Sequence, residues 1–316
     1  MTKVLVTGSK GLLGSAIVAR SAHFGQHDFI FHTRESCDLT SSESTRKYIS
    51  RIRPDVVIHT AALVGGINAN ANAPFQFYLT NTTIDLNVLK ACIDTNVPEL
   101  IGFLSSCIFP DRVSYPITYG SLHTGIPHTS NFGYAHAKRG LDVLVSASRK
   151  QLDVNYKLFI PTNLFGENDN FDLDNSHVIP GLIHKFFNAK KTGTSPKVWG
   201  SGSPLREFVY ARDAADVILN SIGEEFIEPV FLNNGGKESS IKEVAEIIAR
   251  EFGIEEQLIF DISKPDGQLR KPTKNADWVE RILGPQPSTD LPVALQATIN
   301  WFKVNYPNVR KGRVEL

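Results

Sequence analysis

The sequence predicts an α/β fold in which a parallel sheet carries helices on both faces, joined to a smaller α/β region toward the C-terminus. Short apolar, β-branched runs alternate with amphipathic stretches through the first half of the chain. A glycine-rich turn follows the first of these runs, and the alternation stops after Ile160. Strands separated by helices favour a doubly wound parallel sheet, which binds ligands at the carboxyl ends of its strands.

Each expected strand of this sheet is a short apolar run. The strands are Val4–Val6, Phe29–Phe31, Val56–His59, Leu100–Leu104 and Tyr156–Ile160. Helices are expected between them, including one that starts near Ser41–Ser42 and one over Asn81–Thr95.

The second half of the chain is less regular and is expected to form a cap over the substrate. It opens with a loop-rich stretch, Pro161–Ser176. The expected helices of this half are Val178–Ala189, Ile241–Phe252 and Leu291–Tyr306. Ser239 and Ser240 are N-cap candidates for the middle helix, and Gly253 stands where its C-cap is expected.

The glycine-rich turn has the spacing Gly8-x-x-Gly11-x-x-Gly14 and lies between the first strand and the helical run Ala16–Ala19. Glycines let the backbone approach a pyrophosphate, whose charge is met by amides at the helix N-terminus. Because the strand, turn and helix occur in this order, the pattern predicts a Rossmann dinucleotide site.

The residues after the second strand indicate which dinucleotide binds. An NAD site places an acid there to bind the ribose hydroxyls, whereas this chain has Arg34. Arg34 fits a 2′-phosphate and Lys10 can add charge, so NADP(H) is favoured over NAD(H), unless Arg34 is only a solvated loop residue. Asp38 either contacts the adenine together with Leu39 or caps the next helix, and both uses stay open.

At about 150 residues per domain, a chain of 316 residues predicts two domains. Residues 1–165, with a returning segment near 207–235, are expected to form an NADP(H)-binding Rossmann domain. Residues 166–316, mainly 166–206 and 236–316, are expected to form a substrate-binding domain.

Composition excludes several classes of protein. The 33 basic residues balance the 33 acidic ones, so no net charge draws the chain to nucleic acid or to an anionic membrane. No signal peptide is expected and no apolar run approaches the roughly 20 residues that cross a bilayer, so we expect a cytoplasmic protein. Cys37, Cys92 and Cys107 are odd in number and far apart, so we expect free thiols and no metal site.

Tyr134 and Lys138 stand four residues apart in an expected helix, so their side chains are neighbours. A free tyrosine has a pKa of about 10, and a nearby ammonium favours the phenolate. Lys138 is therefore expected to lower the pKa of Tyr134 and to bind a nicotinamide ribose. Ser105 or Ser106, after the fourth strand, would donate a hydrogen bond to a carbonyl oxygen, and the set predicts a reductase.

Cys107 stands two residues after Ser105. A thiolate can remove a proton from carbon, so a thiol beside a reductase's proton-delivery residues predicts a second reaction in the same pocket. Taken alone, Cys107 would be interpreted as a small buried hydrophobe.

With these motifs in order, the chain resembles the extended short-chain dehydrogenase/reductase family over nearly its whole length. The matching segments are Val64-Gly65-Gly66-Ile67, Ser105-Ser106-Cys107-Ile108-Phe109-Pro110, Asn131-Phe132-Gly133-Tyr134-Ala135-x-Ala137-Lys138, Pro161-Thr162-Asn163-Leu164-Phe165-Gly166, Asp169-Asn170-Phe171, Ser176-His177-Val178-Ile179-Pro180, Val198-Trp199-Gly200-Ser201-Gly202, Arg206-Glu207-Phe208 and Lys264-Pro265-Asp266-Gly267. Within that family it is similar to enzymes that epimerise GDP-4-keto-6-deoxy-D-mannose at C3 and C5 and reduce it at C4 to GDP-L-fucose.

The resemblance implies a role for each group of residues. Those implied to hold NADP(H) are Gly8, Lys10, Gly11, Leu12, Gly14, Arg34, Asp38, Leu39, Ser105, Tyr134, Lys138, Pro161, Asn163, Leu164 and His177. Those implied to bind the GDP-linked 4-keto-6-deoxy sugar are Asn163, Lys185, Trp199, Arg206, Asp266 and Lys271. The implied catalytic residues are Ser105, Tyr134 and Lys138 for reduction, with Cys107 as base and His177 as acid for epimerisation. A homodimer is also implied, through helices near Phe75–Thr95 and Tyr134–Arg149.

The chemistry agrees with the Cys107 and His177 pair. A ketone at C4 acidifies the hydrogens on both neighbouring carbons, and inverting either centre needs a base on one face and an acid on the other. Because a free cysteine has a pKa of about 8.5, a positive charge is expected beside Cys107, and His177 can supply it. Without its motif, His177 would be interpreted as a hydrogen-bonding loop residue.

The substrate residues also have plain structural interpretations. Trp199 can be core packing, Arg206 a surface salt-bridge partner, and Asp266 and Lys271 solvated loop charges. Lys185 stands where the family often has an arginine on the diphosphate, so bidentate binding there is lost.

Two other functions remain open on this scaffold. One is a nucleotide-sugar 4,6-dehydratase or 4-epimerase, although a dehydratase usually carries an acidic pair where Cys107-Ile108 stand. The other is a non-catalytic NADP(H)-binding protein, which would tend to lose the pair Tyr134 and Lys138.

Overall fold

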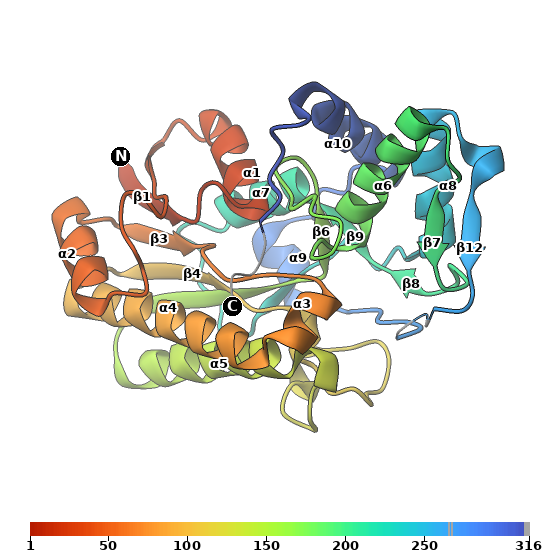
Figure 1. The fold of residues 1–316 in the computed structure, drawn as a ribbon. Coiled ribbons are helices and arrows are strands. Elements are labelled where there is room, and N and C mark those ends of the chain that lie inside the picture. The colour runs from red at the N-terminus through yellow and green to blue at the C-terminus, as the bar shows by residue number, and fades with distance from the viewer. Residues whose placement is uncertain (265, 267, 313–316) are drawn as a thin grey trace.

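The computed structural model describes residues 1–264, 266 and 268–312, and its centre is a 6-stranded sheet (Figure 1). The strands are β1 (Thr2–Thr7), β2 (His27–Phe31), β3 (Val56–His59), β4 (Glu99–Phe103), β5 (Asn155–Pro161) and β10 (Val230–Leu232). Their order is β10-β5-β4-β3-β1-β2, and every neighbouring pair is parallel. The chain order reverses between β1 and β3, where such a sheet opens a ligand crevice at its carboxyl edge.

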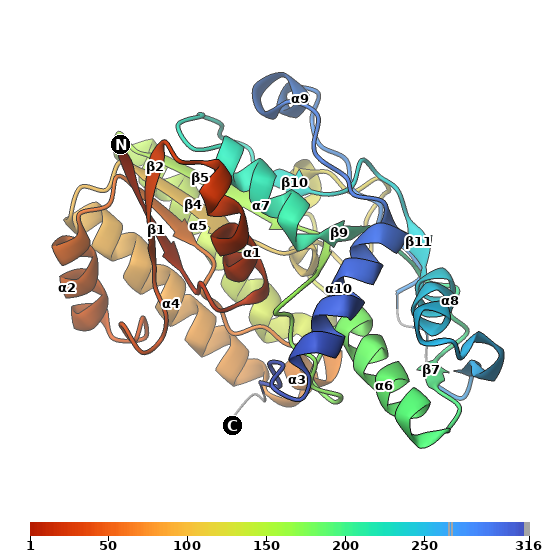
Figure 2. The same ribbon diagram turned by 90° about the horizontal axis from the view of Figure 1, so that it is seen from above.

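Helices cover both faces of the sheet, so the predicted doubly wound fold is confirmed (Figures 1 and 2). One face carries α2 (Ser42–Ile52), α4 (Pro74–Asp94) and α5 (Phe132–Gln151), and the other carries α1 (Leu12–Arg20) and α7 (Ala211–Asn220). Side chains alternate between the faces of a strand. Leu5 therefore packs with the first set of helices, whereas Val4 and Val6 pack with the second.

A second apolar core lies to one side of the sheet. Its helices are α6 (Val178–Thr192), α8 (Ile241–Phe252) and α10 (Leu291–Asn305), which Figure 2 shows gathered away from α2. Short strand pairs extend it: β6 (Asn163–Phe165) with β9 (Phe208–Tyr210), β7 (Lys197–Trp199) with β12 (Ile259–Asp261), and β8 (Leu205–Arg206) with β11 (Ser239–Ser240). The remaining helices are α3 (Ile67–Asn72) and α9 (Trp278–Leu283), with 3₁₀ turns at Ser21–His23, Ser106–Ile108, Tyr119–Ser121, Thr129–Asn131 and Glu255–Gln257.

Local sequence signals gave some boundaries correctly and missed others. In α8, Ser240 Oγ accepts a hydrogen bond from the Glu243 amide at 3.0 Å, and Gly253 takes the left-handed conformation with φ of 63°, both as predicted. Helix α4 starts at Pro74 rather than Asn81, because proline suits the first turn of a helix. The stretch predicted as loop after Ile160 contains β6, which exists through its pairing with β9.

Hydropathy adds one fact about the helices. Of those that the structure describes, none combines the length and the apolar character needed to cross a bilayer.

Candidate active site

The turn between β1 and α1 has the shape that a pyrophosphate needs. Gly8 has φ of 67°, and a Cβ added there would lie 2.7 Å from Cα of Ala61, so only glycine fits. A Cβ added at Gly14 would overlap the Gly8 carbonyl. At Gly11, by contrast, a Cβ would have only the Gly8 carbonyl at 3.3 Å and Arg310 at 3.7 Å within reach among the described residues. The Gly11 side of the turn is therefore open.

The N-terminus of α1 is suited to an anion. Gly11 is its N-cap and has no side-chain cap, and its first turn, which begins at Leu12, holds no acidic residue. A negative charge is stabilised at such an uncapped helix N-terminus. The residues present therefore fit the pyrophosphate of NADP(H).

Two cations, Lys10 of the glycine turn and Arg34 of the loop after β2, are in different states. Lys10 Nζ pairs with the Glu35 carboxylate at 3.2 Å. Hydrogen bonds, above all from Thr33, together with Lys10 lower the pKa of Glu35 to about 2, so Glu35 is charged at neutral pH and competes with a phosphate for Lys10. Arg34 is exposed and has no such partner among the described residues. It is the cation of this loop that stays available to a 2′-phosphate.

Asp38 does not cap α2, so that alternative is wrong. Its Oδ1 accepts hydrogen bonds from the Thr40 amide at 3.0 Å and hydroxyl at 2.8 Å. The cap is Ser41, whose Oγ accepts from the amide of Ser44 at 3.3 Å. The Leu39 side chain is buried in the core against the sheet, so a cofactor contact there would come from its backbone. Contact of either residue with adenine stays a prediction.

The end of β4 and helix α5 bring the reduction residues together. Tyr134 and Lys138 are 9% and 3% exposed on α5, and Ser105 follows β4. Burial, and then the negative charges of Cys107 and Asp85, raise the pKa of Tyr134, while a hydrogen bond with Ser105 opposes them. The pKa of Tyr134 is therefore raised on balance, not lowered as its pairing with Lys138 predicted. A neutral tyrosine is the form that can donate a proton.

Lys138 is held by a buried carboxylate that sequence reasoning missed, Asp85 of α4. Both Asp85 oxygens accept hydrogen bonds from Lys138 Nζ at 3.1 Å, and one lies 3.2 Å from Nε2 of His59. His59 Nδ1 in turn lies 2.7 Å from the Thr7 hydroxyl at the end of β1. Burial raises the pKa of Asp85, but Lys138 and His59 outweigh burial and hold the pKa below its usual range. The available signal was an acid on the inner face of an expected helix, since such an acid is paired.

Cys107 lies in the 3₁₀ turn that starts directly after Ser105. Ser105 Oγ accepts a hydrogen bond from the Cys107 amide at 3.2 Å, so one turn positions both the serine and the thiol. Two cations lie within electrostatic range of the sulfur. Burial lowers the pKa of Arg206 and of Lys271, and the charge of a Cys107 thiolate raises both again. Sequence reasoning expected His177 to supply the charge beside this thiol, which stays a prediction, and it missed the cations Arg206 and Lys271.

His177 is exposed at the N-cap of α6. A fully buried carboxyl, Asp169, is its electrostatic neighbour: burial raises the pKa of Asp169, and the charge of His177 opposes that rise. The loop before His177 packs closely on the segment after β3. A Cβ added at Gly66 of that segment would lie only 2.6 Å from the Ser176 carbonyl. Among the described residues, no hydrogen bond or ion pair joins His177 to Cys107. An acid and a base that act on opposite faces of a sugar need no such contact.

Lys185 and Trp199 form a pair in the second half of the molecule. Lys185 Nζ lies 5.6 Å from the centre of the Trp199 ring and donates to the Lys197 carbonyl at 2.9 Å. Trp199 is 56% exposed, so its interpretation as core packing is wrong. Asp266 accepts hydrogen bonds from the Ser201 amide at 2.6 Å and hydroxyl at 2.9 Å, which ties down the loop after β7. The motif residues Pro265 and Gly267 lie outside the described residues.

The remaining residues expected to bind ligand follow β5. They are Pro161, Asn163 and Leu164. Asn163 Nδ2 donates to the carbonyl of Glu207 at 3.0 Å. The buried Glu207 carboxyl accepts from the Thr273 amide at 3.2 Å and hydroxyl at 2.6 Å, which fixes the segment of Lys271. Glu207 lies in a recognised motif, but its partner 66 residues away could not be read from the sequence.

Known proteins resemble this chain over almost its full length. Residues 4–227 match the NAD dependent epimerase/dehydratase family. The chain is 39% identical over 312 residues to the GDP-L-fucose synthase of Dictyostelium discoideum, covering 98% of this chain and 97% of the relative. It is 34% identical over 303 residues to the GDP-L-colitose synthase of Yersinia pseudotuberculosis, covering 95% and 97%.

A solved structure agrees with these matches. The GDP-L-fucose synthetase from Naegleria fowleri bound to NADP has a TM-score of 0.91 to this chain at 37% identity, covering 98% of this chain and 95% of the other. The family match spans the glycine turn, Ser105, Tyr134 and Lys138. The chain belongs to the NAD dependent epimerase/dehydratase family.

Proposed function

We propose that this chain is a GDP-L-fucose synthase, which epimerises GDP-4-keto-6-deoxy-D-mannose at C3 and C5 and reduces it at C4 with NADPH. The observation that carries the proposal is a thiol, Cys107, in one 3₁₀ turn with Ser105 and beside the buried Tyr134. A simple reductase or 4-epimerase of this family needs no thiol there. The Dictyostelium and Naegleria relatives support the same substrate.

NADPH, when bound, supplies the hydride for reduction. The open side of the glycine turn at Gly11 and the exposed Arg34 are the proposed contacts for its pyrophosphate and 2′-phosphate. The NADP-bound Naegleria structure supports NADP(H) rather than NAD(H).

In the reduction, Tyr134 donates a proton to the sugar oxygen at C4. Its buried phenol is neutral and can give up that proton. Ser105 hydrogen-bonds Tyr134 and is placed to orient the same oxygen. Lys138, fixed by Asp85 at 3.1 Å, holds its ammonium in position to stabilise the phenolate that remains.

In the epimerisation, Cys107 is the base and His177 the acid. The Cys107 thiolate takes the proton from C3 or C5, which the C4 ketone acidifies, and His177 returns a proton from the opposite face. Arg206 and Lys271 supply positive charge around the thiolate. Asp169, behind His177, faces the charge of the imidazolium.

Turnover in deuterated water tests the proposal. With GDP-4-keto-6-deoxy-D-mannose and NADPH we expect NADPH oxidation and a GDP-L-fucose product that carries deuterium at C3 and C5. If NADPH is not oxidised, the proposed function is wrong.

Cys107→Ser separates the two reactions. It should abolish deuterium uptake while the variant still reduces a keto-sugar that is already epimerised. The matched control is Cys37→Ser, because Cys37 is a buried thiol of the core next to α2. Normal deuterium uptake by Cys107→Ser would refute the assignment of the base.

A second substrate is favoured by one observation, the relative named GDP-L-colitose synthase. Colitose lacks the 3-hydroxyl of fucose, so the two activities differ in the keto-sugar that is accepted. Rates with the 6-deoxy and the 3,6-dideoxy GDP-keto-sugars decide between them. A higher kcat/KM for the dideoxy sugar would favour the GDP-L-colitose synthase activity over the GDP-L-fucose synthase activity.

We infer that two copies of the chain pair through α4 and α5. Large exposed apolar side chains gather on these helices: Phe75, Tyr78, Leu79 and Leu86 on α4, and Phe132 and Val143 on α5. The two helices pack side by side on one face of the sheet, so a second copy could cover both. Sedimentation velocity should give a dimer mass, and a monomer mass would contradict the inference.

We also propose that the enzyme works in the cytoplasm. Cys107 must remain a thiol to act as a base, and Cys37, Cys92 and Cys107 are all free. Cytosolic thiols are kept reduced. Fractionation should recover the activity with cytosolic markers, and recovery in a secretory fraction would contradict this location.

A further inference from the structure

The chain after α10 turns back from the second core toward α1 (Figure 1). Val309 is 6% exposed and is part of the second core. The Phe171 amide donates to the Arg310 carbonyl at 2.9 Å. Asn170 exchanges two hydrogen bonds with the backbone of Gly312, at 3.0 and 3.1 Å. The backbone around Arg310 is therefore fixed.

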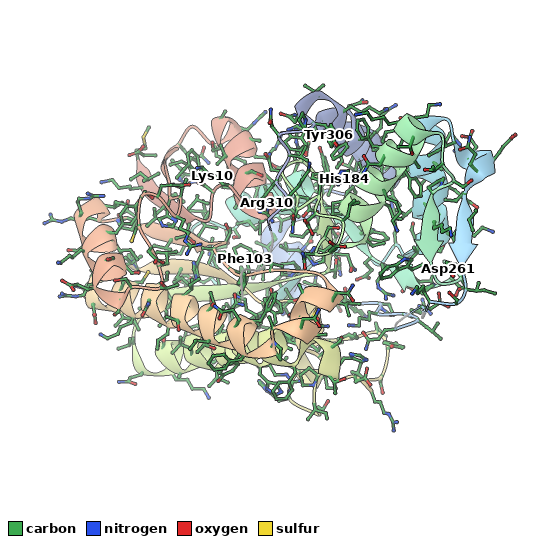
Figure 3. All side chains as sticks on the ribbon, viewed as in Figure 1. Lys10, Phe103, His184, Asp261, Tyr306 and Arg310 are labelled. Carbon is green, nitrogen blue, oxygen red and sulfur yellow. The ribbon has the colours of Figure 1, made fainter. Side chains whose placement is uncertain are left out.

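The side chain of Arg310 reaches the glycine turn. Its Nη1 would lie 3.7 Å from a Cβ added at Gly11, on the side of the turn that is open. Figure 3 shows Arg310 in the same part of the molecule as Lys10 of that turn. The guanidinium is exposed and makes no hydrogen bond or ion pair among the described residues. Its donors are free.

A buried acid explains why a cation is held at this place. Asp169 is 3% exposed, and its Oδ1 accepts from the Asn170 amide at 2.7 Å. Asp169 Oδ2 has no hydrogen-bond partner among the described residues. Burial raises the pKa of Asp169, and the charges of His177 and Arg310 oppose that rise. Asp169 therefore attracts Arg310 without occupying the donors of its guanidinium.

We propose that Arg310 is a further cofactor-binding residue, which donates hydrogen bonds to the pyrophosphate of NADP(H) from the side opposite the glycine turn. The inference rests on the proposed function, because it takes NADP(H) as the ligand. A guanidinium fork matches phosphate oxygens. The turn's own cation, Lys10, is paired with Glu35, whereas Arg310 has free donors among the described residues and lies next to Gly11.

The proposal gives the C-terminal segment a role in coupling the two parts of the molecule. Arg310 is attached through Asn170 and Phe171 to the loop that leads to His177. A cofactor bound against Gly11 would thus contact both the sheet and the segment next to the proposed acid.

Direct binding of NADPH, without sugar, tests the role of Arg310. Arg310→Ala should raise the Kd for NADPH and for NADH by the same factor, about 10- to 100-fold. Arg34→Ala should instead raise only the Kd for NADPH. The matched control is Lys311→Ala, which removes the neighbouring charge of the same segment, a lysine placed 4.9 Å from the Tyr306 ring. An Arg310→Ala variant that binds NADPH as Lys311→Ala does would overturn the inference.

Adenosine 2′-phosphate, which lacks the pyrophosphate, distinguishes a contact from general damage. Its Kd should be the same for the original protein and for Arg310→Ala. An equal loss of affinity for this ligand would also overturn the inference, because Arg310 would then act on the whole fold. If the unsubstituted chain binds no NADPH, the proposed function itself fails, which is a separate result.

Discussion

The two halves of the proposed active site are built in different ways. The reduction half stands on α5, a helix of 20 residues, where Tyr134 and Lys138 are 9% and 3% exposed and Asp85 holds the lysine at 3.1 Å. The sugar half stands on short strands and a helix N-terminus, where His177 is exposed and Trp199 is 56% exposed. The first half is part of the core, whereas His177 and Trp199 of the second half lie on the surface.

This difference concerns preorganisation. A side chain locked by core packing and a buried ion pair is already in its working position before substrate arrives, which favours transition-state stabilisation. A side chain on an exposed strand contributes one contact to binding. A single substitution should therefore cost much in the reduction half and little in the sugar half.

Tyr134→Phe should have the largest effect. It removes the proposed proton donor, and general acid catalysis contributes about 10²- to 10⁴-fold, so kcat for NADPH oxidation should fall by about that factor. Deuterium uptake at C3 and C5 should continue, since Cys107 and His177 are intact. Stopped-flow absorbance of NADPH and NMR of the sugar measure the two reactions. A variant that oxidises NADPH at an undiminished rate would remove Tyr134 from the mechanism.

Asp85→Asn should come next, through stability. It leaves the Lys138 ammonium, 3% exposed, without its charged partner, and breaking a buried pair costs about 3–5 kcal/mol. Urea denaturation measures the loss. The matched control is the double variant Asp85→Asn with Lys138→Met, which removes both charges and should recover part of the free energy of unfolding. If Asp85→Asn lowers the free energy of unfolding by less than about 1 kcal/mol, the pair contributes no more than a surface ion pair.

The Asp85 contribution should also depend on pH in one direction. The pKa of Asp85 is lower in the folded protein than in the unfolded chain, so the unfolded chain binds more protons in acid. The stabilisation is fully present above the unfolded pKa of about 3.9 and is lost as pH falls through the folded pKa. The difference in free energy of unfolding between the original protein and Asp85→Asn should become smaller in that acidic range. If this difference stays constant as the pH falls, Asp85 is not the charged partner of Lys138.

What could be predicted from the sequence was local. The strand runs, the cap at Ser240 and the turn glycine at Gly253 each depend on neighbours within a few residues, and the structure confirms them. The motif that holds Ser105 and Cys107 was equally visible, because one 3₁₀ turn carries both.

What could not be predicted depends on chain segments that are far apart. Asp85 meets Lys138 across 53 residues. Burial, and then the charges of Cys107 and Asp85, raise the pKa of Tyr134 against the expected direction. Arg206 and Lys271 act on Cys107 from two distant segments, which the hydrogen bond between Thr273 and Glu207 joins. No spacing in the sequence encodes these approaches, since packing of the two cores decides them.

Lys185 gives the smallest and most discriminating test of the sugar half. Its ammonium lies 5.6 Å from the exposed Trp199 ring and reaches no charged partner among the described residues, so its removal forfeits one weak contact. Lys185→Ala should raise KM for the GDP-sugar about two- to fivefold and leave kcat unchanged. Lys185→Arg should lower KM, because a guanidinium can bind a diphosphate through two parallel hydrogen bonds. Lys264, 5.8 Å from the same ring, supplies the matched control, and Lys264→Ala should not change KM. A kcat loss in Lys185→Ala comparable to that of Tyr134→Phe would mean that the exposed half is as preorganised as the buried one.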